Sequence, residues 1–502
     1  MSDILIGTDI GTLGTKTIAC TIEGQVVAEE YKGYDIQTTK PGWVEFPMKK
    51  PTKAVYDTIK NALKKGNVNP ADVRGVCISG LYGGSGVPID ADFDEVRPCI
   101  PWLDTRAIKE CDWIRENIGE EKIAEITGNC IHPYWGFTKM LWIKNNEPDN
   151  WSRIKYLLTP HAYVIYMLTG EISLDYSSAG NYGGIWDIHK NRISYDMLKE
   201  LGFPNAMFPP DVVKSCDVVG EIDAKGAMVS GLKKGTPVSA GGIDAPVEAL
   251  SVGTFATGEH TACIGTSMCH NIIQDRASMK LSPLLINYPY VADDESKIYT
   301  FGGAATAAGI ISWYKKNWGG DMDYAELDEL AKKAPPGSDG LVVLPYFNGE
   351  RTPIWDPYAR GTIIGLTLFH TTAHVFRAFL EGVAYSLKDN VDTAREIGAS
   401  LDDTMTLIGG GAKSSLWRKI FADITGYKMR YVAKSHGAPL GDVLLAGVGN
   451  NLFGYDEIKK WTDVSEITKP DPSNHTRYEE YFKIFKRTYE LNKATFQQLY
   501  GA

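Results

Sequence analysis

The first residues of this chain that can do chemistry lie in a glycine- and threonine-rich bend, where Gly11 and Thr12 follow the carboxylate of Asp9. An apolar run at residues 4–6 enters the bend and a β-type run at residues 17–22 leaves it, so we expect a hairpin. Amide groups and threonine hydroxyls at such a tip can bind a polyphosphate, and Asp9 can hold a metal ion through water. An Asx turn is the alternative role for Asp9.

Two common phosphate motifs do not fit this bend. A P-loop needs glycine directly before its lysine, whereas Thr15 precedes Lys16. The dinucleotide fingerprint needs glycine where Asp9 stands, and it opens a helix rather than a second strand. Lys16 is expected either to reach a phosphate or to be an ordinary exposed hairpin lysine. A tight hairpin with purely structural glycines is the alternative interpretation of the whole bend.

A second turn of the same kind, formed by Gly265 and Thr266, lies between β-type runs at residues 259–264 and 268–273. This internal echo predicts that the second half of the chain is built on the plan of the first, so that a nucleotide's phosphates are held between two hairpins. A third glycine turn, at residues 409–411, follows a strand and precedes a helix, where a flat base or a phosphate can approach the backbone.

A lone carboxylate, Asp244, follows the glycine pair Gly241 and Gly242 at the end of a predicted strand. A carboxylate in such a position can take the proton of a hydroxyl group that attacks a phosphate. Its place two residues before Pro246 fits a helix N-cap equally well. The residues alone therefore leave both roles open.

The composition limits the class of protein. A chain of 502 residues, 43% hydrophobic and 23% charged, is typical of a globular protein and too long for one core, so two large domains are expected. The net charge of −10 argues against nucleic acid or an anionic membrane as a partner. The cysteines include no C-x-x-C pair, which favours reduced thiols over disulfides or a zinc site. Since no segment is typical of a signal peptide or a membrane span, we expect a cytoplasmic protein.

The order of elements predicts an α/β fold whose ligands lie at strand ends. Residues 51–65 are expected to form a helix with one apolar face, and residues 73–79 a short buried strand. Two long helices are expected at residues 373–396 and 478–499. The region 128–229 is rich in aromatic residues and loops, and it is expected to carry substrate specificity.

Taken together, these stretches resemble the FGGY carbohydrate kinases, a family within the actin, Hsp70 and sugar-kinase superfamily, over nearly the whole chain. Residues 9–12 look like the family's first phosphate motif, residues 265–267 like the second, and residues 409–412 like the adenosine motif. Two longer stretches, residues 139–146 and 361–381, are similar to the family's signatures.

The resemblance implies a two-domain actin-like ATPase fold, also called ribonuclease H-like, with a nucleotide cleft between the domains. We expect an N-terminal domain over residues 1–247 and a C-terminal domain over residues 248–502, which close over ATP and sugar about a hinge near residues 245–255. The resemblance also implies a phosphotransferase that uses ATP and Mg²⁺ and acts on an alcohol group of a small sugar.

The same resemblance assigns roles to single residues. It implies that Asp244 is the general base and that Asp9 orders the magnesium shell. The nucleotide is expected to bind at residues of the glycine-rich motifs: Gly11, Thr12, Lys16, Gly265, Thr266, Gly309, Gly410, Gly411, Ala412 and Ser415. The sugar is expected to contact Asp244 together with Tyr82, Gly83, Trp102, Asp104 and Tyr134. Aromatic faces stack on the C–H side of a sugar and Asp104 takes hydroxyls, while plain core packing is the alternative role of Trp102.

Within the family the chain looks most like xylulokinases, because residues 349–353 and 438–447 carry their pattern. Residues 82–84, Tyr-Gly-Gly, stand where xylulokinases usually carry Gln-Met-His, and residues 243–245 and 265–270 are closer to ribulokinase-like members. We therefore expect a ketopentose such as D-xylulose as substrate, with ribulose or another sugar or polyol as the alternative. The two glycines are expected to leave space for a sugar that differs from D-xylulose.

Two further expectations concern class and assembly. A chaperone- or filament-type ATPase that phosphorylates no second substrate would use the same nucleotide cleft. The aromatic region 128–229 and the carboxylate of Asp244 favour a kinase instead. Because dimers are common among such kinases, a homodimer is expected as well.

Overall fold

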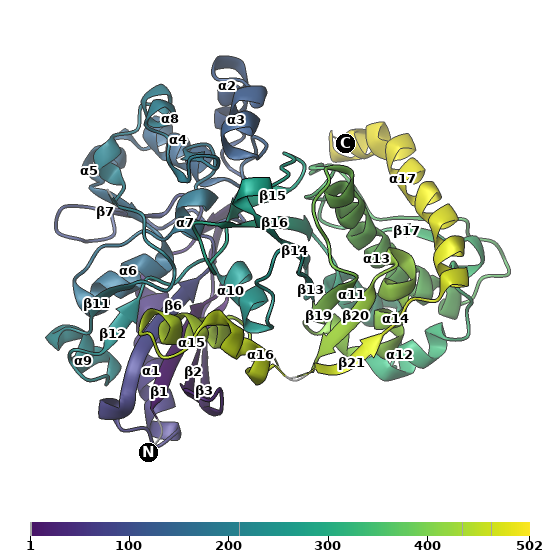
Figure 1. The fold of residues 1–502 in the computed structure, drawn as a ribbon. Coiled ribbons are helices and arrows are strands. Elements are labelled where there is room, and N and C mark those ends of the chain that lie inside the picture. Colours follow the sequence, from purple (N-terminus) through teal and green to yellow (C-terminus); the bar gives the residue numbers. More distant parts are fainter. Residues whose placement is uncertain (1–2, 210, 434, 463, 502) are drawn as a thin grey trace.

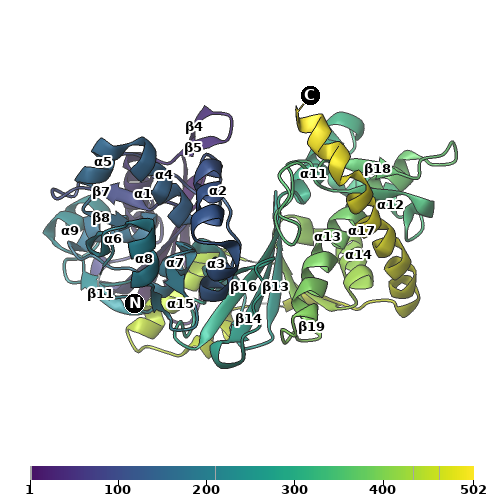
Figure 2. The same ribbon diagram turned by 90° about the horizontal axis from the view of Figure 1, so that it is seen from above.

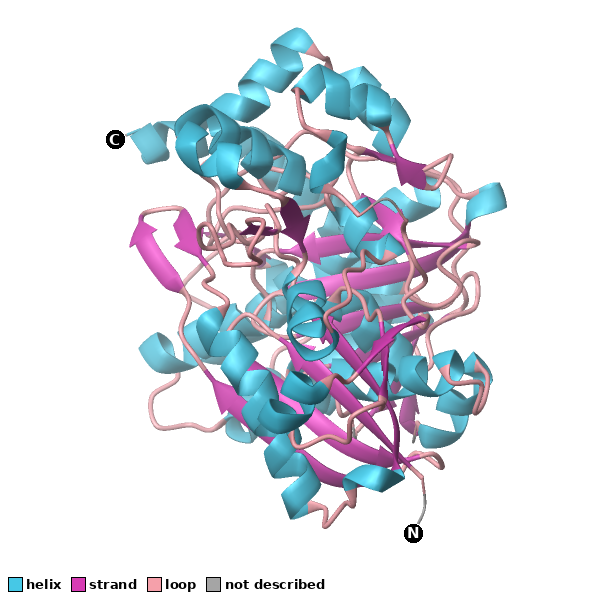
Figure 3. Cartoon of the chain, turned by 90° about the vertical axis from the view of Figure 1, so that its left-hand side faces the viewer, coloured by secondary structure: helices cyan, strands magenta, loops and turns pink. Residues whose placement is uncertain are grey.

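The computed structural model describes residues 3–209, 211–433, 435–462 and 464–501. The chain forms two halves, each built around a mixed β-sheet with helices packed against it (Figures 1 and 2). Figure 3 shows the strands of the two sheets from the side, with the helices around them. The predicted α/β class is confirmed.

The first half contains a six-stranded sheet in the order β11-β12-β6-β1-β2-β3. Its strands are β1 (Ile4–Ile10), β2 (Gly14–Thr21), β3 (Val26–Gly33), β6 (Val73–Gly80), β11 (Val218–Glu221) and β12 (Pro237–Ser239), with short pairs β4 (Gln37–Lys40) and β5 (Trp43–Glu45), β7 (Val87–Ile89) and β8 (Tyr156–Leu158), and β9 (Trp186–Asp187) and β10 (Arg192–Ile193). Its helices are α1 (Lys49–Lys65), α2 (Ile108–Asn117), α3 (Glu120–Thr127), α4 (Gly136–Asn146), α5 (Pro148–Arg153), α6 (Pro160–Thr169), α7 (Tyr176–Asn181), α8 (Tyr195–Leu201), α9 (Ala224–Ser230) and α10 (Asp244–Ser251).

The second half contains a seven-stranded sheet in the order β15-β16-β14-β13-β19-β20-β21. Its strands are β13 (His260–Ile264), β14 (Met268–Asp275), β15 (Ile286–Pro289), β16 (Lys297–Ala304), β19 (Thr404–Ile408), β20 (Lys428–Val432) and β21 (Val464–Thr468), with a separate pair β17 (Val342–Leu344) and β18 (Thr362–Ile364). The remaining helices are α11 (Ala308–Trp318), α12 (Tyr324–Ala331), α13 (Thr372–Glu396), α14 (Ser415–Thr425), α15 (Ala438–Gly449), α16 (Ile458–Trp461) and α17 (Pro472–Gly501).

The two sheets share one plan. The order β3-β2-β1-β6-β12-β11 corresponds strand by strand to β16-β14-β13-β19-β20-β21, and β15 is an extra edge strand. In both sheets the first three strands pair antiparallel, the next two join in parallel, and the last pairs antiparallel. The prediction from the two Gly-Thr turns, that the second half of the chain repeats the plan of the first, is therefore confirmed.

The side chains of β1 show why the first sheet is covered on both faces. Successive residues of a strand point to opposite faces, and here both sets are apolar. Ile4 and Ile6 pack in one cluster with Val55 of α1, whereas Leu5 packs in another cluster with Val443 of α15. Strands buried on both faces read as continuous apolar runs, as the first three residues of β1, at 4–6, do.

Helix α15 belongs spatially to the first half, although in the sequence it lies between β20 and β21 of the second half. It packs against β1, β6 and α10, and Figure 1 shows it beside β6 before the chain returns to β21. A Cβ atom on Gly7 would lie 1.9 Å from the carbonyl oxygen of Pro439, so the approach of α15 to β1 requires glycine. The predicted division at residue 247 remains a prediction.

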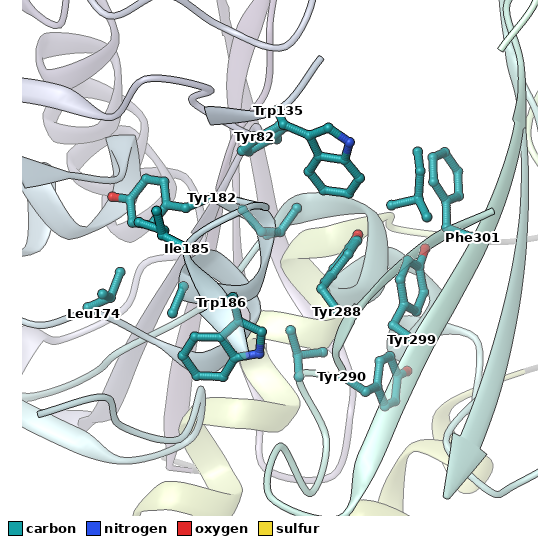
Figure 4. Packing of buried hydrophobic residues seen from close by; sticks show 14 of the residues in the cluster. Tyr82, Trp135, Leu174, Tyr182, Ile185, Trp186, Tyr288, Tyr290, Tyr299 and Phe301 are labelled. Atoms are coloured by element: carbon teal, nitrogen blue, oxygen red, sulfur yellow. The ribbon is translucent and has the colours of Figure 1, made fainter. Parts of the chain in front are cut away.

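The aromatic region joins the two halves. Tyr288 and Phe301 from β15 and β16 pack in one buried cluster with Trp186 of the first half, as Figure 4 shows. Asn129 and Asn287 also exchange hydrogen bonds between the halves, at 2.7 and 2.8 Å. Within the described residues, no helix is long and apolar enough to cross a membrane.

Candidate active site

A cavity of about 500 Å³ lies where the two halves meet. Strand ends, hairpin tips and the start of α10 surround it. Its lining residues are Asp9, Thr12, Lys16, Tyr82, Trp102, Tyr134, Ile243, Asp244, Ala245, Glu248, Cys263, Gly265, Ser267, Cys269, Tyr288, Phe301, Arg351, Gly409, Ser435, His436, Gly437, Ala438 and Pro439. The cavity thus brings together both Gly-Thr hairpins, the lone carboxylate and most of the predicted aromatic residues.

The hairpin of β1 and β2 contributes charged groups to the cavity. Asp9 and Lys16 are directly paired across the two strands. The tip is closed by the amide of Gly11, which donates to the carbonyl of Gly14 at 3.0 Å. Lys16 also forms an ion pair with Glu29 at 3.2 Å, so its ammonium group has a partner within the fold.

In this hairpin, Asp9 is the residue whose carboxylate includes an oxygen without a hydrogen-bond partner among the described residues. Its Oδ1 atom is buried and has no hydrogen-bond partner among the described residues. Burial, and next the negative charge of Asp244, raise the pKa of Asp9 well above its ordinary value. A buried carboxylate oxygen without a donor is unfavourable, so this atom is suited to a ligand that brings positive charge or water.

The hairpin of β13 and β14 is held at its tip by α11. Gly265 accepts from the amide of Ala308 at 2.9 Å, and the carbonyl of Thr266 accepts from the amide of Gly309 at 3.1 Å. A Cβ atom on Gly309 would lie 2.9 Å from that same carbonyl oxygen. Gly309, predicted to contact nucleotide, therefore packs on the hairpin, and it does not line the cavity.

Asp244 is the first residue of α10, and Ile243 holds the N-cap position. The N-cap alternative for Asp244 is therefore not what the structure shows. Among the described residues, its Oδ1 atom accepts a hydrogen bond from the neighbouring amide of Ala245, at 2.7 Å. Burial raises the pKa of Asp244 to about 7; the Ala245 hydrogen bond opposes this rise, and the charge of Glu248 adds to it.

Aromatic side chains and one arginine form the other side of the cavity. The rings of Tyr82 and Tyr134 lie 5.1 Å apart, and the indole N–H of Trp102 donates to the hydroxyl of Thr12 at 3.4 Å. The guanidinium of Arg351 lies 5.7 Å from the ring of Trp102. Its Nε atom is buried without a hydrogen-bond partner among the described residues.

Two predicted sugar contacts are not brought to the cavity. The carboxylate of Asp104 is fully buried and accepts from Arg106 Nε at 2.8 Å and from the amide of Val44 at 2.6 Å. It is therefore already satisfied within the fold. Gly83 leaves no space for a sugar, because a Cβ atom there would lie 2.6 Å from Cδ of Pro160.

Gly84 and two glycines of the predicted adenosine motif also do not line the cavity. A Cβ atom on Gly84 would lie 2.1 Å from the carbonyl of Ile100, so this glycine is also required by packing. Within the turn after β19, Gly409 lines the cavity, whereas Gly410 is exposed with open space around it and Gly411 is buried against Ile264.

The last two predicted nucleotide contacts lie close to this turn. The carbonyl of Ala412 accepts from Arg418 at 2.7 Å. Ser415 begins α14 and is exposed, with Ser414 as the helix cap. Neither residue lines the cavity as described.

Sequence reasoning missed several lining residues. Glu248 lies one helical turn after Asp244, and this i,i+4 spacing was a usable signal. Tyr288 and His436 reach the cavity from segments distant in sequence, and no local pattern indicates either of them. His436 bonds to Glu29 at 3.0 Å, the same carboxylate that pairs with Lys16.

The comparison with protein families decides the identity of this fold. The N-terminal domain of the FGGY family of carbohydrate kinases matches residues 4–251, and the C-terminal domain of that family matches residues 261–449. The chain belongs to the FGGY family of carbohydrate kinases. The Gly-Thr turns of both predicted phosphate hairpins lie within the matched residues.

Individual relatives cover nearly the whole chain. The xylulose kinase of Staphylococcus epidermidis (strain ATCC 12228 / FDA PCI 1200) is 30% identical over 98% of both chains, and that of Bacillus subtilis (strain 168) is 29% identical over 97% of both. Among solved structures, xylulose kinase from Rhodospirillum rubrum is 27% identical, with a TM-score of 0.90 over 98% of this chain and 100% of that one.

Family membership settles the class of this FGGY kinase. It is a sugar kinase, which transfers a phosphoryl group from ATP to an alcohol group of a small sugar. The predicted two-domain actin-like fold is confirmed by the same likeness. An actin-like ATPase without a sugar substrate is not supported.

Proposed function

We propose that this FGGY kinase transfers the γ-phosphoryl group of ATP to a hydroxyl of a ketopentose such as D-xylulose, with Asp244 as general base. The observation that carries the proposal is the position of Asp244, which lies in one cavity with both Gly-Thr hairpins and the aromatic side chains. The full-length relatives named xylulose kinase support the choice of sugar.

In the proposed reaction, the sugar hydroxyl oxygen attacks the γ-phosphorus of ATP. The bond between that phosphorus and the β,γ-bridging oxygen breaks, and ADP leaves. The hydroxyl proton passes to the carboxylate of Asp244, of whose two oxygens only Oδ1 accepts a backbone hydrogen bond among the described residues. Phosphoryl transfer passes through a loose transition state, so catalysis needs mainly positioning and charge neutralisation.

The two hairpins are proposed to bind the phosphates through Gly11, Thr12, Gly265 and Thr266. The turn at residues 409–412 and the start of α14 at Ser415 are proposed to receive the adenosine, with the exposed backbone of Gly410 free to meet it. Gly309 is proposed to act through the hairpin it supports, and Lys16 to remain close to the phosphates.

The residues present fit a magnesium ion carried by the nucleotide. Mg²⁺ keeps several waters and binds through one or two carboxylates plus substrate phosphates. Asp9 offers one buried oxygen without a partner among the described residues. Within the described part of the chain, no group of three or more His, Cys, Asp or Glu residues is placed to hold a metal by itself. Asp9 is therefore proposed to hold Mg²⁺ through water, and the bound ion would neutralise phosphate charge.

The sugar is proposed to lie against Trp102, Tyr134 and Tyr82, whose rings line the cavity. Arg351 lies beside these rings with an N–H that has no partner among the described residues, so it is suited to donate a hydrogen bond to a sugar oxygen. Figure 4 shows Tyr82, Tyr288 and Phe301 in this region.

The test is an ADP-release assay over D-xylulose, D- and L-ribulose, L-xylulose, glycerol, erythritol and xylitol. It compares wild type with Asp244→Asn and with Asp223→Asn as the matched control. Asp223 caps α9 through a hydrogen bond to Gly226, and asparagine caps a helix equally well. We expect one preferred ketopentose, loss of kcat by about 10²–10⁴-fold in Asp244→Asn, and no comparable loss in Asp223→Asn.

Each other outcome changes a different part of the proposal. A preferred ribulose or polyol would replace D-xylulose and keep the kinase mechanism. Turnover of ATP without sugar that survives Asp244→Asn would overturn the kinase role of the cavity. Equal loss in both variants would show that the effect is not specific to the proposed base.

The proposal includes compartment, assembly and domains. Eight free cysteines support a reducing compartment such as the cytoplasm. A homodimer is proposed as the assembly, and light scattering of the purified protein tests it. The boundary near residue 247 is proposed as the point from which the two halves close over the substrates, and scattering with and without ATP and sugar tests it.

A further inference from the structure

The orientation of Asp244 depends on the backbone that precedes it. Its carboxylate has one hydrogen bond, to the amide of the next residue, so no other side chain among the described residues fixes it by hydrogen bonding. The turn before α10 is tightly packed on β6. Gly241 has φ of +70°, and a Cβ atom there would lie 1.9 Å from the carbonyl of Ile78. Small shifts of this turn would move the carboxylate.

A buried serine holds this turn next to Asp244. The amide of Ile243 donates to the hydroxyl oxygen of Ser177 at 3.1 Å. Ser177 belongs to α7, about 65 residues earlier in the sequence, and its side chain is fully buried. The serine hydroxyl in turn donates to Oδ1 of Asp175 at 2.5 Å.

Asp175 is anchored from its other oxygen by a histidine. Nε2 of His161 lies 2.9 Å from Oδ2 of Asp175, and both side chains are buried. Burial acts to raise the pKa of Asp175, but hydrogen bonds from His161 and from the serines outweigh it, and the pKa lies below its ordinary value. The carboxylate is therefore charged and can only accept hydrogen bonds.

The donor directions along this chain of contacts follow from that charge. Because Asp175 only accepts, Ser177 gives its single proton to it, and the serine oxygen is left to accept from Ile243. Nε2 of His161 carries a proton for the same reason. Its Nδ1 atom has no hydrogen-bond partner among the described residues.

A helix cap alone does not explain this arrangement. Asp175 caps α7 by accepting from the amide of Ser178 at 2.9 Å, and this contact requires neither His161 nor the hydroxyl of Ser177. Of the two additional contacts, Ser177 connects the cap to the turn before α10, and His161 of α6 holds the other oxygen of Asp175. The structure thus uses a capped helix as a rigid support for a segment of another element.

A second support meets the same turn from the other side. The backbone carbonyl of Ser215 accepts from the amide of Gly241 at 2.9 Å, and the Ser215 hydroxyl donates to Oδ2 of Asp294 at 2.7 Å. A Cβ atom on Gly242 would lie 2.7 Å from Cγ1 of Val291, 3.0 Å from the hydroxyl oxygen of Ser177 and 3.2 Å from that of Ser215. Glycine is therefore needed where the two supports converge, directly before Ile243.

We propose that Ser177, held by Asp175 and His161, is a positioning residue for Asp244. It fixes the backbone from which the carboxylate points into the cavity, and it does not itself line the cavity. This inference rests on the proposed role of Asp244 as general base. Loss of the hydroxyl leaves the buried amide of Ile243 without its acceptor, and a misplacement of about 1 Å at a reacting group can lower kcat by about 10²-fold.

The experiment compares Ser177→Ala with Ser230→Ala. Ser230 is also fully buried, and its hydroxyl donates to a backbone carbonyl within α9, so its removal reports the general effect of losing a buried hydroxyl. We expect kcat of Ser177→Ala to fall by about tenfold or more, with KM for ATP and sugar little changed. Ser230→Ala is expected to keep its kcat. A kcat of Ser177→Ala close to wild type would overturn the proposal.

A second pair of variants separates positioning from folding. Ser177→Thr and Ser177→Val have the same shape, but threonine keeps the hydroxyl and valine does not. We expect the valine variant to have a kcat at least about tenfold below the threonine variant, and equal values would overturn the proposal. Asp244→Asn is measured alongside. If it stays active, the proposed role of Asp244 as general base is wrong. If it is inactive while Ser177→Ala is unaffected, the positioning role of Ser177 is refuted and the role of Asp244 stands.

Discussion

The hairpin of β1 and β2 and the hairpin of β13 and β14 occupy equivalent places in the two sheets, yet they bring different side chains to the cavity. Counted back from the hairpin glycines Gly11 and Gly265, Asp9 corresponds to Cys263. Asp9 is paired across its hairpin with Lys16, whereas Cys263 is paired with Cys269. All four residues line the cavity.

This difference separates two tasks that a phosphotransferase must perform. A polyphosphate needs backbone amides and hydroxyl groups around it, and both hairpin tips offer Gly-Thr. The proposed magnesium site needs a carboxylate at one hairpin, and only the first hairpin supplies one at this position, in Asp9. The fold repeats the binding element and places the charged pair in one copy.

The strands next to the two hairpins, β6 and β19, also lead to different sides of the cavity. β6 continues into the segment that carries Tyr82, on the aromatic side of the cavity. β19, its equivalent, continues into the turn that begins with Gly409. One copy of the plan therefore leads to the proposed sugar site and the other to the proposed adenosine site.

The largest expected effect is removal of the charge that distinguishes the copies. Asp9→Asn is expected to lower kcat by about 10²-fold and to raise the Mg²⁺ concentration needed for half-maximal activity. Cys263→Ser, at the equivalent position, is expected to change kcat by no more than about twofold. Initial rates over a Mg²⁺ titration measure both variants. Similar losses in the two variants would show that the copies do not divide the tasks in this way.

A smaller effect is expected when the second hairpin also receives a carboxylate, so that the two hairpins no longer differ in this respect. Cys263→Asp adds a carboxylate opposite the charged hairpin, and we expect KM for ATP to rise by about tenfold at low salt. The rise should shrink as ionic strength increases, because salt screens charges that solvent reaches. Cys263→Asn has nearly the same shape without the charge and is the control. A rise of the same size in both variants would point to packing instead.

The two hairpin glycines provide a test of the shared binding role. A Cβ atom on Gly265 would be 3.6 Å from its nearest neighbour, an ordinary contact, so Gly265→Ala is expected to leave the Tm unchanged and to raise KM for ATP several-fold. A Cβ atom on Gly11 would be 3.1 Å from the carbonyl of Gly14, so Gly11→Ala is expected to lower the Tm as well. Thermal melts and ATP titrations separate the two effects. An unchanged KM for ATP in Gly265→Ala would mean that the phosphates do not approach this tip.

The repeated plan could be predicted because its signals are local. Each hairpin spans fewer than twenty consecutive residues, and its turn glycine and flanking apolar runs are visible in the sequence. The helices expected at residues 51–65 and 373–396 are present as α1 and α13, with ends shifted by one or two residues. The helix expected at residues 478–499 begins earlier, because α17 starts at Pro472.

The predicted sugar contacts that do not line the cavity share a different physical cause. Asp104 is satisfied by an amide 60 residues away in the sequence, at Val44. The glycine at position 83 is required by Pro160, and the one at position 84 by Ile100. Such contacts depend on how elements pack, and nothing in the spacing of Tyr-Gly-Gly distinguishes a glycine that opens space from one that allows close packing.

The return of α15 to the first sheet was likewise invisible in the sequence. Its apolar residues, such as Val443 and Leu444, fit any buried helix. What identifies its place is the contact of Pro439 with Gly7, which joins positions more than 400 residues apart. The loop before α15 then brings His436 to the cavity, beside the charged hairpin.

The smallest expected effect is a shift in the pH dependence of kcat/KM when the charge of Glu248, beside Asp244, is removed. Burial raises the pKa of Asp244 to about 7, and the charge of Glu248 adds to that rise. Only the ionised form of a general base can take a proton, so kcat/KM should fall as the pH drops below about 7. Glu248→Gln removes a neighbouring negative charge, which lowers the pKa of Asp244 and moves this acid limb to lower pH.

The expected shift is below about one pH unit, since burial remains the main cause of the raised pKa. Glu326→Gln is the matched control, because Glu326 is exposed in the capping box of α12 and glutamine preserves that box. Profiles of kcat/KM against pH for the three proteins measure the shift. A limb that moves upward in Glu248→Gln, or equally in both variants, would contradict a direct effect of Glu248 on Asp244. A downward shift confined to Glu248→Gln would place the titrating group on the charged side of the cavity.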